Sequence, residues 1–407
     1  MATYKEQNKL NVPHLRFPEF HGEWCVSTIG EQFDLYSGNT PSRLNKEHFE
    51  GNVNWITSGE LKEHYISDTK EKISEDAATA NNLKLLHPGT FVIAIYGLEA
   101  DGVRGTGSIT CKESTISQAC MAFTQKGDVK NEFLYSWYKK HGNIIGIKYA
   151  QGTKQQNLSY DILEKFHIAF PSQDEQDKLI KFISLLDERI ATQSKLIEDL
   201  KKLKSAIIEN VFDDKHSERL QLDNVGSYIR GLTYSSNDVV EHGGTLVMRS
   251  NNIVNGSLLD YNNNVVFVNK QMSAEQQLQN GDIVICMANG SSSLVGKSSF
   301  YDGNWHSSIT VGAFCGIYRS KEPIVKWLFQ TNKYRRYIWN SLQGGNGAIA
   351  NLNGEDILNM SFSIPNAPIK NTCVKMLTSV DSALENNISL CALYTLQKQH
   401  LLRQMFI

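Results

Sequence analysis

The chain has 407 residues, a formal net charge of −2, 41% hydrophobic residues and 21% charged residues. This length exceeds that of one ordinary domain, and the composition is typical of a folded globular protein, which excludes a wholly disordered chain. No apolar run reaches the roughly 18 residues that a membrane span requires, and residues 1–10 lack the apolar segment of a signal peptide. We therefore expect a cytoplasmic protein with no membrane partner.

The cysteines and the charge balance limit the kinds of site. The seven cysteines are scattered without a Cys-x-x-Cys pair, and no close His/Cys cluster is present, so we expect reduced structural thiols and no metal site. A weakly acidic chain is unusual for a DNA-binding protein, because such domains are generally basic. DNA binding remains compatible with this charge if partner subunits share the phosphate contacts.

The first half of the chain divides into three parts. A polar lead segment, residues 1–19, precedes residues 20–170, where short apolar runs such as Phe91–Ile95 alternate with Gly, Asn and Ser turns. This pattern predicts a mixed domain of short strands and helices. Residues 171–213 form the third part: from Gln173 to Phe212 they lack Gly and Pro and carry apolar residues at helical spacing, which predicts a helix about 58 Å long. Its expected packing residues are Leu179, Ile183, Leu186, Ile190, Ile197, Leu200 and Ile207.

The second half repeats this order. Residues 214–365 again show short apolar runs between turns, and residues 366–407 again show helical spacing. Because a long helix with one apolar stripe needs a partner, we expect the two helices to pack together. The expected packing residues of the second helix are Leu377, Leu384, Ile388 and Leu401.

The two halves are copies of one unit. An offset of 194 residues carries Asp187 onto Asp381 and Lys204 onto Lys398. Identity elsewhere is low, so two related folds with different surfaces are expected, which suits two related but different ligand sites. Further paired landmarks are Gly89 with Gly281, Ser58 with Ser250, Asn157 with Asn351, and Phe212 with Phe406.

The predicted fold is α+β. It comprises two mixed α/β domains in tandem, separated by two long helices that pack as an antiparallel coiled coil with pseudo-two-fold symmetry. The alternative is two separate domains, each of which docks its own helix.

Several segments resemble one family. They are Asn11–Trp24 (NVPHLRFPEFHGEW), Ser37–Ser42 (SGNTPS), Gly152–Ser159 (GTKQQNLS) and the stretch from Pro171 through Glu175 and Gln176 into the long helix. In this order they resemble the specificity subunits of type I restriction–modification systems, over essentially the whole chain. The second copy departs from the pattern: it lacks the Thr-Pro motif near Arg230 and has Pro365–Lys370 where the first copy has Pro-x-x-x-Glu-Gln.

The resemblance implies a non-catalytic subunit that binds double-stranded DNA. Each mixed domain would read one half of a two-part target, and the helices would set the spacer and dock two modification subunits. Those subunits would methylate adenine with S-adenosylmethionine, and restriction subunits would use ATP and magnesium. This chain itself would hold no cofactor.

Polar side chains in loops after strands are the candidate DNA contacts. Asn and Gln can pair with adenine, and Arg and Lys with guanine. The candidates in the first domain are Arg43, Ser58, Glu60, Arg104, Lys154, Gln155, Gln156 and Asn157. Those in the second domain are Arg230, Arg249, Ser250, Asn251, Asn252, Asn289, Lys297, Asn346 and Asn351.

No catalytic motif is apparent. The chain has no Pro-Pro pair and therefore no Asp/Asn-Pro-Pro-Tyr/Phe methyltransferase motif, and the segment Gly290–Ser298 has five residues between its glycines where a phosphate loop needs four. We therefore interpret this segment as a turn or a DNA-facing loop. Two rival functions remain: a coiled-coil scaffold with two protein-binding domains, and an enzyme such as a fused methyltransferase or a nuclease.

Overall fold

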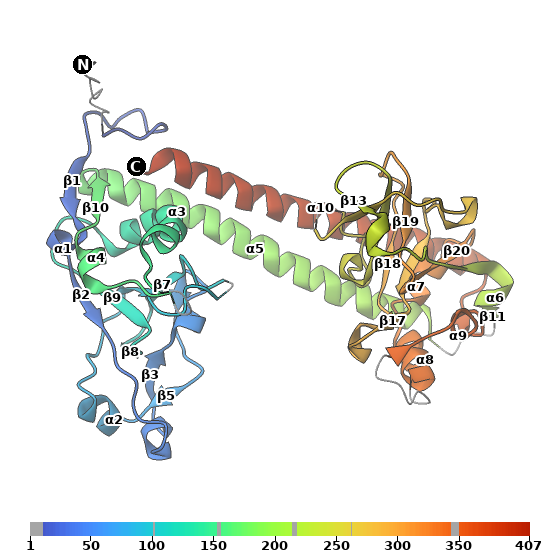
Figure 1. Ribbon diagram of the computed structural model, residues 1–407, viewed down its shortest axis with the longest axis horizontal. Helices are drawn as coiled ribbons and strands as arrows, with labels where there is room; N and C mark the ends of the chain where they lie inside the picture. The colour runs from blue at the N-terminus through green and yellow to red at the C-terminus, as the bar shows by residue number, and fades with distance from the viewer. Residues whose placement is uncertain (1–10, 101, 153–155, 214–217, 262, 343–349) are drawn as a thin grey trace. The chain divides into compact units, whose positions relative to one another are not determined.

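The computed structural model describes residues 11–100, 102–152, 156–213, 218–261, 263–342 and 350–407. The chain divides into two compact units (Figure 1). Unit 1 comprises residues 1–194 and 389–407, and unit 2 comprises residues 195–388. The division runs through two long helices, α5 (Gln173–Val211) and α10 (Ala367–Met405), so that each unit contains one sheet-rich domain and part of each helix.

The domain of unit 1 is built on a sheet with strand order β2-β9-β6-β7-β4 and a smaller sheet with order β5-β3-β8. A separate antiparallel ladder joins β1 to β10, so the beginning and end of the domain are paired. The elements are β1 (Cys25–Thr28), α1 (Ile29–Gln32), β2 (Phe33–Ser37), β3 (Val53–Ile56), β4 (Tyr65–Ile66), β5 (Lys72–Ile73), α2 (Glu75–Ala80), β6 (Phe91–Ala94), β7 (Gly107–Thr110), β8 (Ser114–Ile116), β9 (Cys120–Gln125), α3 (Asn131–Tyr149), α4 (Tyr160–Glu164) and β10 (His167–Phe170).

The domain of unit 2 has sheets with strand orders β12-β20-β16-β18 and β13-β15-β14-β19, and ladders β11-β22 and β17-β21. The elements are β11 (Glu218–Gln221), α6 (Leu222–Val225), β12 (Gly226–Arg230), β13 (Val239–Val240), β14 (Thr245–Met248), β15 (Val266–Val268), β16 (Ile283–Cys286), β17 (Ala288–Asn289), β18 (Ser298–Phe300), β19 (Ile309–Val311), β20 (Cys315–Ser320), α7 (Val325–Leu328), α8 (Asn332–Leu342), β21 (Ala350–Asn351), α9 (Gly354–Leu358) and β22 (Ser361–Ile364).

The two domains share one plan. The order β2-β9-β6-β7 in unit 1 corresponds to β12-β20-β16-β18 in unit 2, and the parallel pair β3·β8 corresponds to β14·β19. The turn before the central strand of each domain uses a glycine with positive φ, +85° at Gly89 and +90° at Gly281, a conformation that a side chain disfavours. The predicted duplication and the α+β class with two tandem mixed domains are confirmed.

The central strands are buried because both faces are covered. All four residues of β6 and all four of β16 are buried. In unit 1, α3 packs on β6, β7 and β9, and Phe91 meets Tyr135 and Tyr138 of this helix edge to face. A strand buried on both sides is expected to be apolar at every position, which explains the continuous apolar runs.

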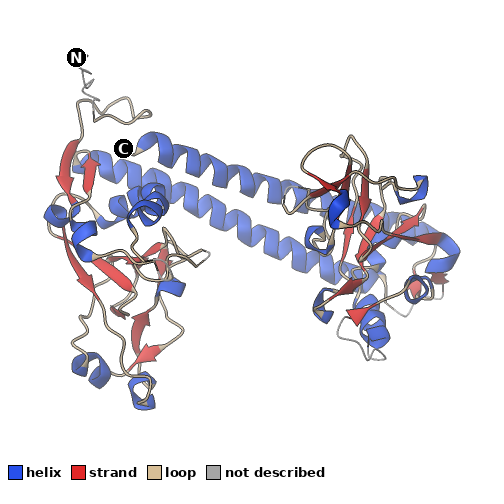
Figure 2. Cartoon of the chain, viewed as in Figure 1, coloured by secondary structure: helices blue, strands red, loops and turns tan. Residues whose placement is uncertain are grey.

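The long helices pack antiparallel within each unit (Figure 2). In unit 1, Arg189 of α5 donates to the Tyr394 hydroxyl of α10 at 2.9 Å, and Ser194 lies 3.6 Å from Cys391. From the first contact to the second, the residue number increases on α5 and decreases on α10, so the two helices run antiparallel in unit 1. In unit 2, Ile208 of α5 shares a core with Leu377 of α10.

Gln176, within the Glu-Gln pair at the start of α5, joins the helix to its domain. Its side chain is fully buried, donates to the carbonyls of Asp128 and Pro171, and accepts from the Lys130 amide. The second copy has Lys370 at the equivalent position, and its ammonium pairs with Glu322 at 3.2 Å. An ion pair therefore joins helix and domain in unit 2, where the sequence lacks the Glu-Gln pair.

Candidate nucleic-acid interface

Three strand ends meet at one corner of each domain. In unit 2 the chain leaves β12 at Gly231, β14 at Arg249 and β19 at Gly312, and the Leu232 amide donates to the Val311 carbonyl at 2.7 Å. A Cβ on Gly231 would lie 2.1 Å from the Gly312 carbonyl oxygen, so only glycine allows this approach. We call these three strand ends the corner of unit 2.

Unit 1 has the same corner. The Asn39 amide donates to the Ile116 carbonyl at 3.3 Å, and a Cβ on Gly38 would lie 1.8 Å from that oxygen. The second segment of each corner is a short 3-10 turn, Ser58–Glu60 in unit 1 and Ser250–Asn252 in unit 2. It is closed by the side chain of its third residue, which accepts from the preceding backbone amide, that of Thr57 in unit 1 and that of Arg249 in unit 2. Equivalent backbone therefore presents different side chains in the two units.

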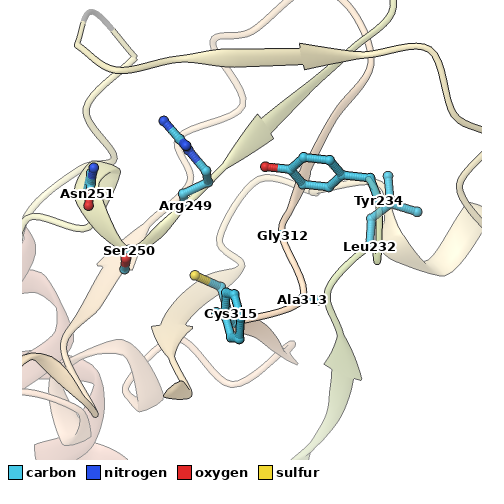
Figure 3. Close-up of a pocket in the computed structure, with 9 residues that line it drawn as sticks. Leu232, Tyr234, Arg249, Ser250, Asn251, Gly312, Ala313 and Cys315 are labelled. Atoms are coloured by element: carbon cyan, nitrogen blue, oxygen red, sulfur yellow. The ribbon is translucent and has the colours of Figure 1, made fainter. Parts of the chain in front are cut away.

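A pocket of about 370 Å³ opens at the corner of unit 2 (Figure 3). Its lining residues are Leu232, Tyr234, Arg249, Ser250, Asn251, Gly312, Ala313, Phe314 and Cys315. The Arg249 guanidinium donates through Nη2 to the Asn264 carbonyl at 2.8 Å, and Phe314 is 66% exposed. The pocket thus combines a cation, amide and hydroxyl groups, and aromatic rings, which are the groups that contact base edges.

The structure gives the other candidates of unit 2 different surroundings. Asn289 donates to the Ser250 hydroxyl at 3.4 Å, and its strand β17 pairs with β21, which contains the exposed Asn351. These residues therefore lie together with the corner. Asn252 is fully buried and uses its amide inside the protein, with Arg249, Asp260 and Asn263, so its contacts are those of a loop-holding residue.

Two further candidates of unit 2 lie elsewhere. Arg230 is exposed at the end of β12, and Lys297 is half-buried beside the turn that precedes β18. Asn346 lies outside the described residues.

In unit 1, two of the charged candidates are engaged within the protein. Arg43 forms two 2.7 Å hydrogen bonds with Glu71 and lies over the rings of Phe49 and Trp55. The Glu60 carboxylate accepts from the Thr57 amide at 2.9 Å and the Lys70 amide at 2.7 Å. Glu60 therefore closes its turn, whereas Ser58 remains half-exposed on the same turn.

The glycine-led loop after α3 contacts the glycine-rich loop after β6. Arg104 donates to the Gln156 side chain at 2.8 Å, and the Gln156 amide donates to Glu99 at 2.8 Å. Asn157 accepts from the Gly97 amide at 3.4 Å. Arg104, Gln156 and Asn157 thus form one cluster, while Lys154 and Gln155 lie outside the described residues.

Most of the expected helix-packing residues are buried or half-buried. Leu179, Ile183, Leu377 and Leu384 are at most 4% exposed, but Ile388 is 40% exposed. The half-buried residues are Leu186, Ile190, Ile197, Leu200, Ile207 and Leu401.

Two equivalent ion pairs were not among the predicted site residues. Asp187 of α5 pairs with Lys398 of α10 in unit 1, and Asp381 of α10 pairs with Lys204 of α5 in unit 2 at 2.7 Å. The repeat aligned these four residues, but only the fold shows that each aspartate meets the lysine of the other copy. A signal was present: the 194-residue offset carries Asp187 onto Asp381 and Lys204 onto Lys398, so an aspartate and a lysine recur together in both copies.

In each unit the aspartate also contacts the adjacent domain. Asp381 accepts from the Trp327 indole at 3.0 Å and pairs with Lys326 at 2.9 Å, both from α7. Asp187 lies 3.5 Å from His64, whose other ring nitrogen is 2.8 Å from Glu132. We call these two groups the aspartate clasps, because each joins both helices to one domain.

The clasp of unit 1 contains shifted pKa values. Burial disfavours the charged form of His64, but hydrogen bonds with Asp187 and Glu132 outweigh it and raise the His64 pKa above its ordinary 6.5. Burial likewise opposes ionisation of Asp187, but hydrogen bonds with His64 and Lys398 outweigh it and lower the Asp187 pKa. The His64 ring is stacked between Tyr65 and Tyr135, at centroid distances of 4.1 and 3.9 Å.

The segment that resembles a phosphate loop is a turn. Residues Ser292–Leu294 form a 3-10 turn, Gly296 has φ of +82°, and the chain continues directly into β18 rather than into a helix. Across the described ranges, no group of three or more His, Cys, Asp or Glu side chains is placed to hold a metal ion. In that same part of the chain, every helix is too short or too polar to span a membrane.

The fold defines a class: two copies of one mixed α/β domain, each joined to a pair of long antiparallel helices. The family model described as the type I restriction modification DNA specificity domain matches residues 21–202 and again residues 215–390. The chain therefore belongs to this family, and the resemblance noted in the sequence is confirmed.

Individual relatives agree with this assignment. Over 196 residues the chain is 28% identical to the type I restriction enzyme MjaIX specificity subunit of Methanocaldococcus jannaschii, covering 47% of this chain and 44% of that protein. Over 153 residues it is 35% identical to the EcoKI specificity subunit of Escherichia coli, covering 36% of this chain and 31% of that protein. These alignments span less than half of each curated relative.

Solved structures extend the likeness to the whole fold. A crystal structure of the type I restriction–modification S subunit from M. genitalium matches 97% of this chain and 99% of its own length, with a TM-score of 0.61 and 17% identity. At this identity the match establishes the fold alone.

Proposed function

We propose that this chain is a specificity subunit that reads a two-part sequence in double-stranded DNA for a type I restriction–modification complex. The observation that carries the proposal is the doubled corner. One backbone arrangement is built twice, in a family whose domain is described as a DNA specificity domain, with different side chains on each copy. Two different readers on one chain suit a target with two different halves.

In this proposal the chain performs no catalysis. Two modification subunits bind the helices, use S-adenosylmethionine and methylate adenine, and restriction subunits use ATP and magnesium. Exposed apolar side chains on α10, at Leu393 and Leu396, support a docking role because they lie on the helix surface with 61% and 58% exposure. The complex acts in the cytoplasm.

Only some of the predicted DNA contacts are assigned to DNA binding in this proposal. Asn252 and Glu60 are assigned to holding their turns, because their polar atoms are already engaged within the protein. Arg249, Ser250, Asn251, Asn289 and Asn351 form the proposed reading surface of unit 2. In unit 1, Ser58, Arg104, Gln156 and Asn157 are the corresponding candidates.

The test is a methylome. The chain is expressed with the modification subunit encoded beside it, and the host DNA is sequenced with detection of methylated adenine. We expect methylation at one two-part motif, present only when this chain is present. Methylation that is unchanged without the chain, or that lacks a two-part motif, would favour a scaffold that binds proteins at both domains.

A further inference from the structure

The corner of unit 2 holds one cation in a fixed position. The Arg249 backbone amide donates to Asn252 Oδ1 at 2.9 Å, and its Nη2 donates to the Asn264 carbonyl. Its Nε is buried and has no hydrogen-bond partner among the described residues. Because the backbone of Arg249 is anchored and its guanidinium is held through Nη2, the side chain loses less conformational entropy on binding than a free arginine would.

The wall beside this cation is aromatic. Tyr234 and Arg249 face each other across the pocket in Figure 3. Phe314, which follows Gly312 and Ala313 between β19 and β20, also lines the pocket. The Phe314 carbonyl accepts from the amides of Met287 and Ala288 at 2.9 and 3.1 Å, which fixes the backbone that carries the exposed ring.

The corner of unit 1 lacks these groups. When the three strand ends of the two units are aligned, Thr57 is equivalent to Arg249, Pro41 to Tyr234 and Ala119 to Phe314. The residues that shape the backbone are kept, notably Gly38 and Gly231, while the side chains at the opening change. This is the pattern expected where the backbone serves both halves and the side chains select the ligand.

Resting on the proposed function, we propose that this pocket reads bases in the half-site of unit 2: Arg249 hydrogen-bonds a guanine, and Phe314 contacts the methyl group of a thymine in the adjoining base pair. Arginine matches the O6 and N7 acceptors of guanine in the major groove, and an apolar ring matches the thymine methyl. A phosphate would engage the cation but would gain nothing from the aromatic wall.

The experiment uses the complex of this chain with its modification subunit and a duplex carrying the methylome motif. Each guanine of the unit 2 half-site is replaced in turn by 7-deazaguanine, which lacks N7, and each thymine by uracil, which lacks the methyl group. One 7-deazaguanine position is expected to weaken binding to the wild-type complex about 5- to 100-fold, but to have no effect on the Arg249→Gln complex. One adjoining uracil position is expected to weaken wild-type binding and to leave the Phe314→Ala complex unaffected.

The control is Arg336→Gln, which removes an equal charge from an exposed position of α8. It is expected to leave every base preference unchanged. Because the modified bases are also tested on the wild-type chain, a variant that fails to fold does not remove the test.

Three outcomes would overturn the inference. If Arg249→Gln weakens binding equally for all sequences, the side chain contacts phosphate. If no modified base in the unit 2 half-site affects the wild-type complex, the pocket reads neither group. If the wild-type chain directs no two-part motif at all, the proposed function fails and this inference fails with it.

Discussion

At the scale of single residues, the two aspartate clasps show how one position serves both copies with different partners. Asp187 and Asp381 each bind the lysine of the opposite helix. The remaining contacts come from His64 in unit 1 and from Lys326 and Trp327 in unit 2. The helix contact is thus common to the two copies, while the domain contact has diverged.

Asp381→Ala is expected to lower the free energy of unfolding of unit 2 by about 3–5 kcal/mol, because it leaves the buried Lys204 ammonium without its counter-ion. Chemical denaturation of the purified chain measures this loss. The matched control is Asp199→Ala on α5, whose carboxylate is exposed and 3.9 Å from Lys202, where about 0.5 kcal/mol or less is expected. Equal losses for the two variants would show that the buried pair does not stabilise unit 2.

His64 makes the stability of unit 1 depend on pH. Because its pKa is raised in the folded state, its contribution is fully present below the unfolded pKa of about 6.5 and is lost as the pH rises through the higher folded pKa. The charged groups around it are Glu132 of α3 and Asp187 of α5, with Lys398 of α10 beyond.

The wild type is therefore expected to lose thermal stability as the pH rises from 6 towards 8. The His64→Gln variant is expected to lack this part of the pH dependence, and thermal unfolding at a series of pH values measures both proteins. The loss of stability below pH 4 is expected to persist in both proteins, since it comes from carboxylates with lowered pKa values, such as Glu71. Parallel pH profiles for the two proteins between pH 6 and 8 would contradict the assignment.

At the scale of elements, helix α10 presents different faces to the protein and to its surroundings. Leu377 is fully buried in the core of unit 2, whereas its neighbour Met376 is 41% exposed. The apolar spacing predicted a helix here, but spacing alone does not separate a residue that packs against α5 from one that remains open to a partner.

Leu377→Ala is expected to destabilise unit 2 by about 2–5 kcal/mol, because it removes buried methyl groups and leaves a cavity. Met376→Ala is the control on the same turn, with an expected change within about 0.5 kcal/mol. Denaturation midpoints compare the two variants, and a larger loss from Met376→Ala would show that this face of α10 is buried.

At the scale of the whole molecule, the proposed function predicts that the two units read DNA independently. Each unit has its own core, its own corner and its own clasp. Exchange of residues 20–170 for the equivalent region of another family member is therefore expected to change one half of the methylated motif and to leave the other half intact. Sequencing of methylated DNA checks this, and the reciprocal exchange of residues 214–365 is the control. A change in both halves would show that the units do not read independently.

The ordered motifs carried the resemblance to the family, and the repeat and the periodicity of the sequence determined the tandem α+β plan and the two long helices. These follow from local physics: apolar residues at helical spacing form an amphipathic helix, and short apolar runs between turns form buried strands. The candidate DNA contacts also included Arg249, Ser250 and Asn251, since residues after a strand tend to lie at its exposed end.

Only the tertiary structure decided which candidates have free polar atoms. Glu60 and Asn252 have the polar chemistry of DNA contacts, yet their hydrogen bonds are taken by groups on their own and neighbouring loops. The pairing of Asp187 with Lys398 likewise joins two residues that are 211 positions apart in the chain, a separation over which no local pattern specifies contact.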